Sequence, residues 1–225
     1  MGFWSSVGGF LGSVCSGIGE VCSKIGGALA TGIGALAGAL APILSTVAPI
    51  ISAIASLIGV FKNEHTPEDY GEAMQKAEKK PDDFDSINEY IAYLDEEISS
   101  GRIQLDEKEK KTDIQKNIDT AIGSALGMKG ISEKYNLEDS VSFWATMGQK
   151  FKDEKIDEKE LVSTLETMSE KDISADDVSA YLEDKTLETN SKSEVSEALK
   201  QGLEKANPEL SKDELTTKFN ELLKS

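Results

Sequence analysis

Hydrophobic and polar positions divide this chain into contrasting parts. Residues 25–61 read IGGALATGIGALAGALAPILSTVAPIISAIASLIGVF and contain no charged side chain. In residues 1–24, apolar side chains recur at three- and four-residue steps, with glycine and serine between them. From Lys62 onward charged residues dominate, and the apolar residues keep a helical period. Because the alternation typical of strands is essentially missing, the pattern predicts an all-α protein.

The changes in composition predict four segments. Residues 1–24 form a glycine/serine-rich amphipathic leader, and residues 25–61 form a glycine/alanine-rich apolar helical hairpin that inserts into a membrane or an assembly. Residues 62–130 are expected to be a helical linker or stalk. Residues 131–225 are expected to be an acidic all-α domain of short capped helices.

Two prolines interrupt the apolar segment, which is about twice as long as the ~20 residues that one membrane crossing needs. Proline removes a helical donor and clashes with the preceding turn, so Pro42 and Pro49 predict a turn or kink between them. We expect one helix over residues 25–41 and a second over residues 50–61. One long kinked helix, or a core hairpin buried in a soluble assembly, is the alternative.

Small residues form a strip along the first of these helices. Such strips let helix backbones approach closely where no hydrophobic force is available, so this one predicts self-association. It consists of Gly26, Ala30, Gly34 and Gly38, with an earlier start at Gly8 and Gly12.

The leader and the end of the apolar segment also suggest surface and modification sites. Phe3, Trp4 and Phe61 would suit positions at a membrane interface. Gly2 lies in an M-G-x-x-x-[ST] pattern, which marks N-myristoylation in eukaryotic cells. Cys15 and Cys22 would lie about 10 Å apart along a helix, which is too far for an internal disulfide. Packing is their first interpretation, and acylation is the alternative.

Helix-start signals follow Lys62. Thr66, Pro67 and the following acids predict a capped helix that ends before Pro81, and a second helix is expected over residues 85–99. A third is expected over residues 106–126. In the last third of the chain, four short segments each pair a capping Asp or Ser with an acidic residue three positions later, as in a capping box. They begin at Asp157, Ser174, Ser191 and Ser211.

Charge and side-chain chemistry exclude several functions. The formal charge of −17 lies entirely on residues 62–225, so nucleic acid is not an expected partner and any membrane contact must come from the apolar segment. The acidic stretches 153–160 and 172–177 lack the central glycine of a calcium-binding loop. The single histidine, His65, is expected to be a solvated linker residue, with pH sensing as the alternative. We expect no enzyme, cofactor or metal site.

This layout resembles that of small pore-forming effectors delivered by bacterial type VI (contractile) secretion systems. The resemblance covers the architecture only. It implies a toxin that lacks a Sec signal, oligomerises in a target bilayer, and has a secretion tube, chaperone or immunity protein as a partner. Two other functions are compatible with the sequence. One is a virion-associated or other assembly protein, and the other is a membrane-anchored adaptor whose acidic domain binds a basic partner.

Overall fold

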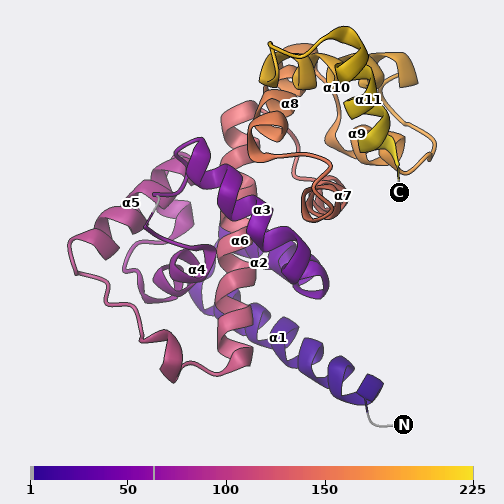
Figure 1. The fold of residues 1–225 in the computed structure, drawn as a ribbon. Coiled ribbons are helices and arrows are strands. Elements are labelled where there is room, and N and C mark those ends of the chain that lie inside the picture. Colours follow the sequence, from indigo (N-terminus) through magenta and orange to yellow (C-terminus); the bar gives the residue numbers. More distant parts are fainter. Residues whose placement is uncertain (1–2, 63, 225) are drawn as a thin grey trace. The chain divides into compact units, whose positions relative to one another are not determined.

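All the regular secondary structure in the described part of the chain is helical. The computed structural model describes residues 3–62 and 64–224, with side chains from residue 9 onward (Figure 1). This confirms the predicted all-α class. The α-helices are α1 (Phe3–Ile25), α2 (Ala28–Leu40), α3 (Leu44–Leu57), α4 (Pro67–Lys76), α5 (Ile87–Ser99), α6 (Asp113–Tyr135), α7 (Val141–Lys152), α8 (Glu158–Lys171), α9 (Ala175–Leu182), α10 (Lys192–Ala206) and α11 (Lys212–Leu223), and the short 3₁₀ helices are η1 (Ala41–Ile43), η2 (Pro81–Asp83) and η3 (Lys108–Lys110).

The helices form two compact units, Met1–Ile131 and Ser132–Ser225. The boundary falls inside α6, one residue after the expected start of the acidic domain. Residues 62–130, expected to be a separate linker or stalk, belong to the same unit as the leader and the apolar segment. The first unit therefore contains both the uncharged helices and a charged partner layer.

Helix α6 is the centre of the first unit, because it contacts α1, α2, α3, α4 and α5 (Figure 1). Three of its glycines make the closest contacts. A Cβ at Gly123 would overlap the Pro67 carbonyl, and one at Gly127 would lie 2.9 Å from Ile51. A Cβ at Gly130 would lie 2.9 Å from Ile91. Side chains larger than hydrogen would therefore push three neighbouring segments away from α6.

The apolar segment does not turn at its prolines. The chain stays helical from Ala28 to Leu57, with one 3₁₀ turn at Ala41–Ile43 that contains Pro42. Pro49 lies inside α3. The predicted turn between residues 42 and 49 is therefore wrong, and the alternative of one long kinked helix describes the structure. A proline ring can bend a helix instead of ending it when the freed carbonyl faces water.

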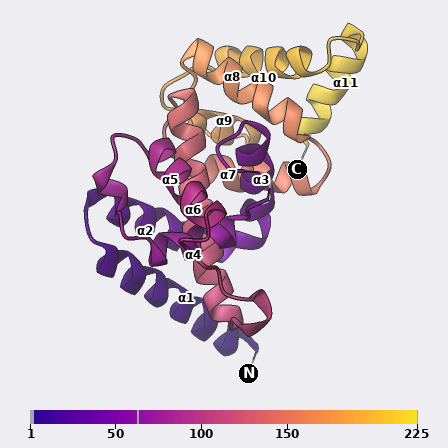
Figure 2. The same cartoon turned by 90° about the vertical axis from the view of Figure 1, so that its left-hand side faces the viewer.

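The reversal of direction lies further upstream, at Gly26 and Gly27. Both have positive φ, 73° and 94°, which L side chains adopt only with strain. After this turn α2 packs against α1, as Figure 2 shows. The helical hairpin of the N-terminal region thus pairs the leader with the apolar segment.

The second unit is a bundle of short, capped helices, with α8 packed on α10 and α7 packed on α9. All four predicted caps are confirmed, because the side chains of Asp157, Ser174, Ser191 and Ser211 each accept from the backbone N–H three residues later. Phe143 and Trp144 are buried in it. The start of α6 differs from the prediction, since residues 106–112 remain outside the helix.

The close contact of α6 with α4 predicts opposite effects for two glycine substitutions. Gly123→Ala should lower the free energy of unfolding by about 3 kcal/mol, because its methyl group would meet backbone atoms. Gly38→Ala should raise it by up to about 1 kcal/mol, since nothing lies within 4 Å and alanine favours the helix. Urea titration followed by circular dichroism measures both. Equal effects would contradict this packing.

Candidate functional site: the apolar helix and the groups that hold it

The candidate site is the apolar helix, by which we mean residues 28–57. One face of it is buried in the first unit, with side chains at three- and four-residue steps. This face consists of Ala30, Ile33, Ala37, Leu40, Leu44, Val47, Ile50, Ile51 and Ile54. At 1.5 Å per residue the helix is about 45 Å long, which exceeds the ~30 Å hydrocarbon core of a bilayer.

The opposite face of the apolar helix is exposed and uncharged. It carries Thr31, Ala35, Ala39, Pro42, Ser45 and Pro49. Both prolines thus lie on the solvent side, where water can satisfy the carbonyl groups that lose their helical donors. Among the side chains that the structure describes, the only exposed large hydrophobic ones are Leu57 and Ile114. The apolar segment is therefore covered by protein on one side and faces solvent with small residues on the other.

A side chain from another segment caps the start of the apolar helix. Gly27 is its N-cap and offers no side chain, but Asp82 in η2 accepts hydrogen bonds from the backbone N–H groups of Ala28 (2.9 Å) and Leu29 (3.2 Å). A Cβ on Gly27 would overlap this carboxylate. A carboxylate at this end also has a favourable interaction with the helix dipole. Asp82 thus joins the start of the apolar helix to η2 through hydrogen bonds.

Aromatic packing fixes the other end. Phe61 is 1% exposed and stacks on Tyr70 with ring centroids 4.2 Å apart. The same ring lies against Gly127 of α6. In this folded state Phe61 thus belongs to the core, and the interfacial anchor expected there stays a prediction for a membrane-bound state. The core position depends on the small surface of α6, which the sequence does not place opposite Phe61.

The residues of the predicted self-association strip are not all available to a second molecule. Gly26 lies in the turn, Ala30 is buried, and a Cβ on Gly34 would lie 2.9 Å from that of Cys22. Part of the strip thus already packs against α1 within one chain. Gly38 and, in α1, Gly12 have nothing within 4 Å of a built Cβ.

Four predicted residues lie wholly or partly outside the described part of the chain. Gly2 precedes it. Phe3, Trp4 and Gly8 belong to α1 by backbone, and their side chains are outside the description.

The two cysteines are free and differ in environment. Cys15 is exposed, whereas Cys22 is 4% exposed and packs at the close contact with Gly34. Burial raises the pKa of the Cys22 thiol, which disfavours the reactive thiolate. Of the two predicted acylation sites, only Cys15 is accessible.

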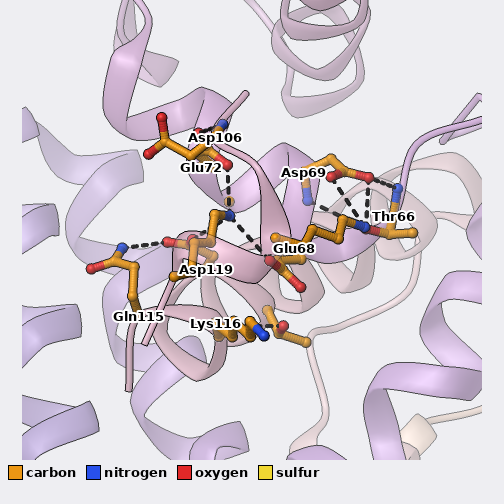
Figure 3. A network of polar contacts seen from close by, with 12 residues as sticks. Thr66, Glu68, Asp69, Glu72, Asp106, Gln115, Lys116 and Asp119 are labelled. Atoms are coloured by element: carbon orange, nitrogen blue, oxygen red, sulfur yellow. Dashed lines mark hydrogen bonds and ion pairs between the residues drawn. The ribbon is translucent and has the colours of Figure 1, made fainter. Parts of the chain in front are cut away.

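A buried ion cluster holds α4 to α6 on the charged side of this unit (Figure 3). The ammonium group of Lys111, 4% exposed, lies 2.6 Å from Glu72, 2.8 Å from Asp119 and 3.1 Å from Glu68. Gln75 and Gln115 both donate to the second oxygen of Asp119, at 2.6 and 2.7 Å. Residues 106–112 lie before α6 and contain η3, and Lys111 turns from this stretch into the cluster.

Electrostatics in the cluster favour the charged forms of Lys111 and Glu72. Burial opposes ionisation of both groups, but hydrogen bonds from Lys111 and Lys76 outweigh it and lower the pKa of Glu72. The three carboxylates likewise raise the pKa of Lys111. Burial raises the pKa of Asp119, and the hydrogen bonds from Lys111, Gln75 and Gln115 offset this effect only in part.

The second unit contains a polar cavity of about 320 Å³. Two of its acids form hydrogen bonds within the unit. Asp176 accepts from the hydroxyls of Ser140 and Ser142, and Asp177 accepts from three backbone N–H groups of the loop 188–190. In the part of the chain that the structure describes, no group of three or more His, Cys, Asp or Glu side chains could hold a metal ion. The cavity is therefore a hydrogen-bonded part of the fold.

Sequence reasoning missed Asp82, Lys111 and the glycines of α6. Of these, only the glycines have a recognisable sequence pattern, because Gly123 and Gly127 are four residues apart in the run AIGSALGMKGI. By length and composition, one helix among the described residues, Ala28–Leu57, could cross a membrane. Comparisons of the chain with family models, with curated proteins and with solved structures found no match.

The ion cluster predicts a change of sign in the pH dependence of stability. In the native chain the lowered pKa of Glu72 contributes stability that is present above its usual value of 4.5 and is lost as the pH falls below it. Lys111→Met should cost about 3–5 kcal/mol at pH 7, because the buried Asp119 and the partly buried Glu68 lose their cation and Glu72 keeps only Lys76. Protonation would then relieve the variant, so its stability should rise as the pH falls from 7 to 5.

Urea unfolding at the two pH values measures this effect. The matched control is Lys110→Met, whose ammonium is 71% exposed and pairs with Glu107 at the surface. It should stay within about 0.5 kcal/mol of the native chain at both pH values. A Lys111→Met variant that loses stability toward pH 5 would contradict this account.

The hydrogen bonds to Asp82 predict a local effect at the start of the apolar helix. Asp82→Ala should cost about 1 kcal/mol and accelerate hydrogen exchange at the amides of Ala28 and Leu29. Asp82→Asn retains a capping oxygen and should stay close to the native chain. If the alanine variant leaves the exchange of both amides unchanged, Asp82 does not cap the helix.

Proposed function

We propose that this protein inserts into membranes, with the apolar helix leaving the folded first unit to enter a bilayer, where it oligomerises into a pore or channel. One observation carries the proposal: the exposed face of the apolar helix has no charged residue. The solvent side of a helix in a soluble protein is normally charged or polar. Here 37 consecutive residues, Ile25 to Phe61, are uncharged although 29% of the whole chain is charged.

The distribution of charged residues along the first unit supports the same function. Residues 62–131 hold 17 acidic and 10 basic side chains, a net charge of −7, whereas residues 1–61 are neutral. The exposed charges of the unit lie on α5, at the start of α6 and in the segments before and after α5, whereas α4 and most of α6 are buried. The arrangement suits a protein that is soluble before it meets its target and exposes the apolar helix afterwards. A secreted effector without a Sec signal is one protein class with this requirement.

The second candidate function is an assembly protein, including a virion-associated one, in which the first unit stays closed. The observation that favours it is the complete coverage of large apolar side chains on the buried face. In that case the exposed small residues of the apolar helix would meet protein instead of lipid. Such a protein would oligomerise without releasing the contents of vesicles.

A reversible lock on the apolar helix separates these functions. Ile51 of α3 lies against Gly127 of α6, where a built Cβ would lie 2.9 Å from the Ile51 Cγ2 and 2.8 Å from the Phe61 ring, so a disulfide can join the two positions once that ring shifts. The lock variant carries Ile51→Cys and Gly127→Cys in a Cys15→Ser, Cys22→Ala background. We expect the reduced lock variant to release carboxyfluorescein from phosphatidylcholine vesicles and the oxidised one to be inactive.

The matched control places a disulfide in the second unit, through Thr164→Cys and Gly202→Cys in the same background. These positions join α8 to α10, and because a Cβ on Gly202 would lie 2.7 Å from the Thr164 backbone, circular dichroism must first show that this variant keeps its helix content. This variant should release dye in both redox states. Release by the oxidised lock variant would contradict insertion of the apolar helix. Absence of release by every variant, together with oligomers in sedimentation, would favour the assembly function.

A further inference from the structure

A second feature of the first unit is a small cavity beside the turn at Gly26 and Gly27. It has a volume of about 290 Å³, near the lower end of the range for ligand pockets. The last turns of α1 and α4 supply its apolar part, which consists of Val21, Ile25, Met74 and Ala77. Val21, Ile25 and Ala77 are partly exposed there, whereas Met74 is 1% exposed and offers little surface.

The polar part of the cavity is basic. Lys24, Lys79 and Lys80 line it, and no acidic residue does. This is unusual in a chain with 41 acidic and only 24 basic residues. The pair between Lys24 and Glu20 is on the surface, with both side chains about 70% exposed, so it competes weakly with a ligand.

Lys79 is positioned by aromatic rings. Its ammonium group lies 5.7 Å from the ring centroid of Phe84 and 5.5 Å from that of Tyr93, within the range of cation–π contacts. A lysine held in this way presents its charge in a defined place. Phosphate and carboxylate groups are the anions that lysine side chains bind through charge-assisted hydrogen bonds.

We propose that this cavity binds an anionic amphiphile, with a phosphate or carboxylate head between the lysines and an alkyl chain on the apolar part. The three cations match the head, and the partly exposed Val21, Ile25 and Ala77 match the chain. The ligand would bridge α1 and α4 and stabilise the folded unit in proportion to its concentration. The inference concerns the folded unit, so it stands or fails separately from membrane insertion.

The test uses three probes on the full-length protein, each below the concentration at which it forms micelles. Octyl phosphate carries head and chain, octyl glucoside carries the same chain with a neutral head, and inorganic phosphate carries the head alone. Calorimetry should show the tightest binding for octyl phosphate, by about tenfold over each of the others. Equal binding of octyl glucoside would reduce the cavity to a nonspecific apolar surface. Equal binding of inorganic phosphate would reduce it to an anion site.

Two variants with the same change in net charge locate the binding. Lys24→Gln with Lys80→Gln should weaken octyl phosphate binding about tenfold and leave octyl glucoside unaffected. Lys62→Gln with Lys110→Gln removes two exposed lysines outside the cavity and should change neither. Ala77→Leu should weaken both alkyl probes by filling the apolar part, with the thermal midpoint as a check on folding. Equal weakening by the two lysine pairs would overturn the proposal.

Discussion

Close backbone approach along α6 is the constraint on which the first unit depends. Gly123 sits against the backbone of α4, Gly127 against α3 and the Phe61 ring, and Gly130 against α5. Glycine is costly inside a helix that is isolated in water, by about 1 kcal/mol relative to alanine. Here three of them let four segments share one central helix. The buried face of the apolar helix acquires its partner only because α6 presents so little side-chain volume there.

Two sets of polar contacts support this packing, one at the first turn of the apolar helix and one between α4 and α6. Asp82 caps the first turn of the apolar helix, and Lys111 neutralises Glu68, Glu72 and Asp119 between α4 and α6. Along its buried face the apolar helix relies on shape and van der Waals contact, because its side chains have no charge to pair. The charged cluster therefore stabilises the layer that receives the apolar helix and does not touch the helix itself.

Local signals in the sequence predicted local structure well. The caps at Thr66, Asp157 and Ser211 are each encoded by a few neighbouring residues, and all of them form. The turn placed between Pro42 and Pro49 failed because the effect of a proline depends on whether its side of the helix faces water. The Asp82 cap spans more than 50 residues, and Lys111 looked like part of a solvated charge run. Neither contact has a local pattern that would reveal it.

The exposed face of the apolar helix is the part whose contact with water would change most on insertion or assembly. Residues such as Ile50 and Ile54 are fully buried already, so moving them from protein to lipid changes their contact with water little. Small-residue packing against α6 would be lost and could be regained only by contact with other helices. The exposed face gains most, since Ala35, Ala39 and Leu57 leave water only on insertion or assembly. The partner that covers this face therefore determines which state of the protein is the functional one.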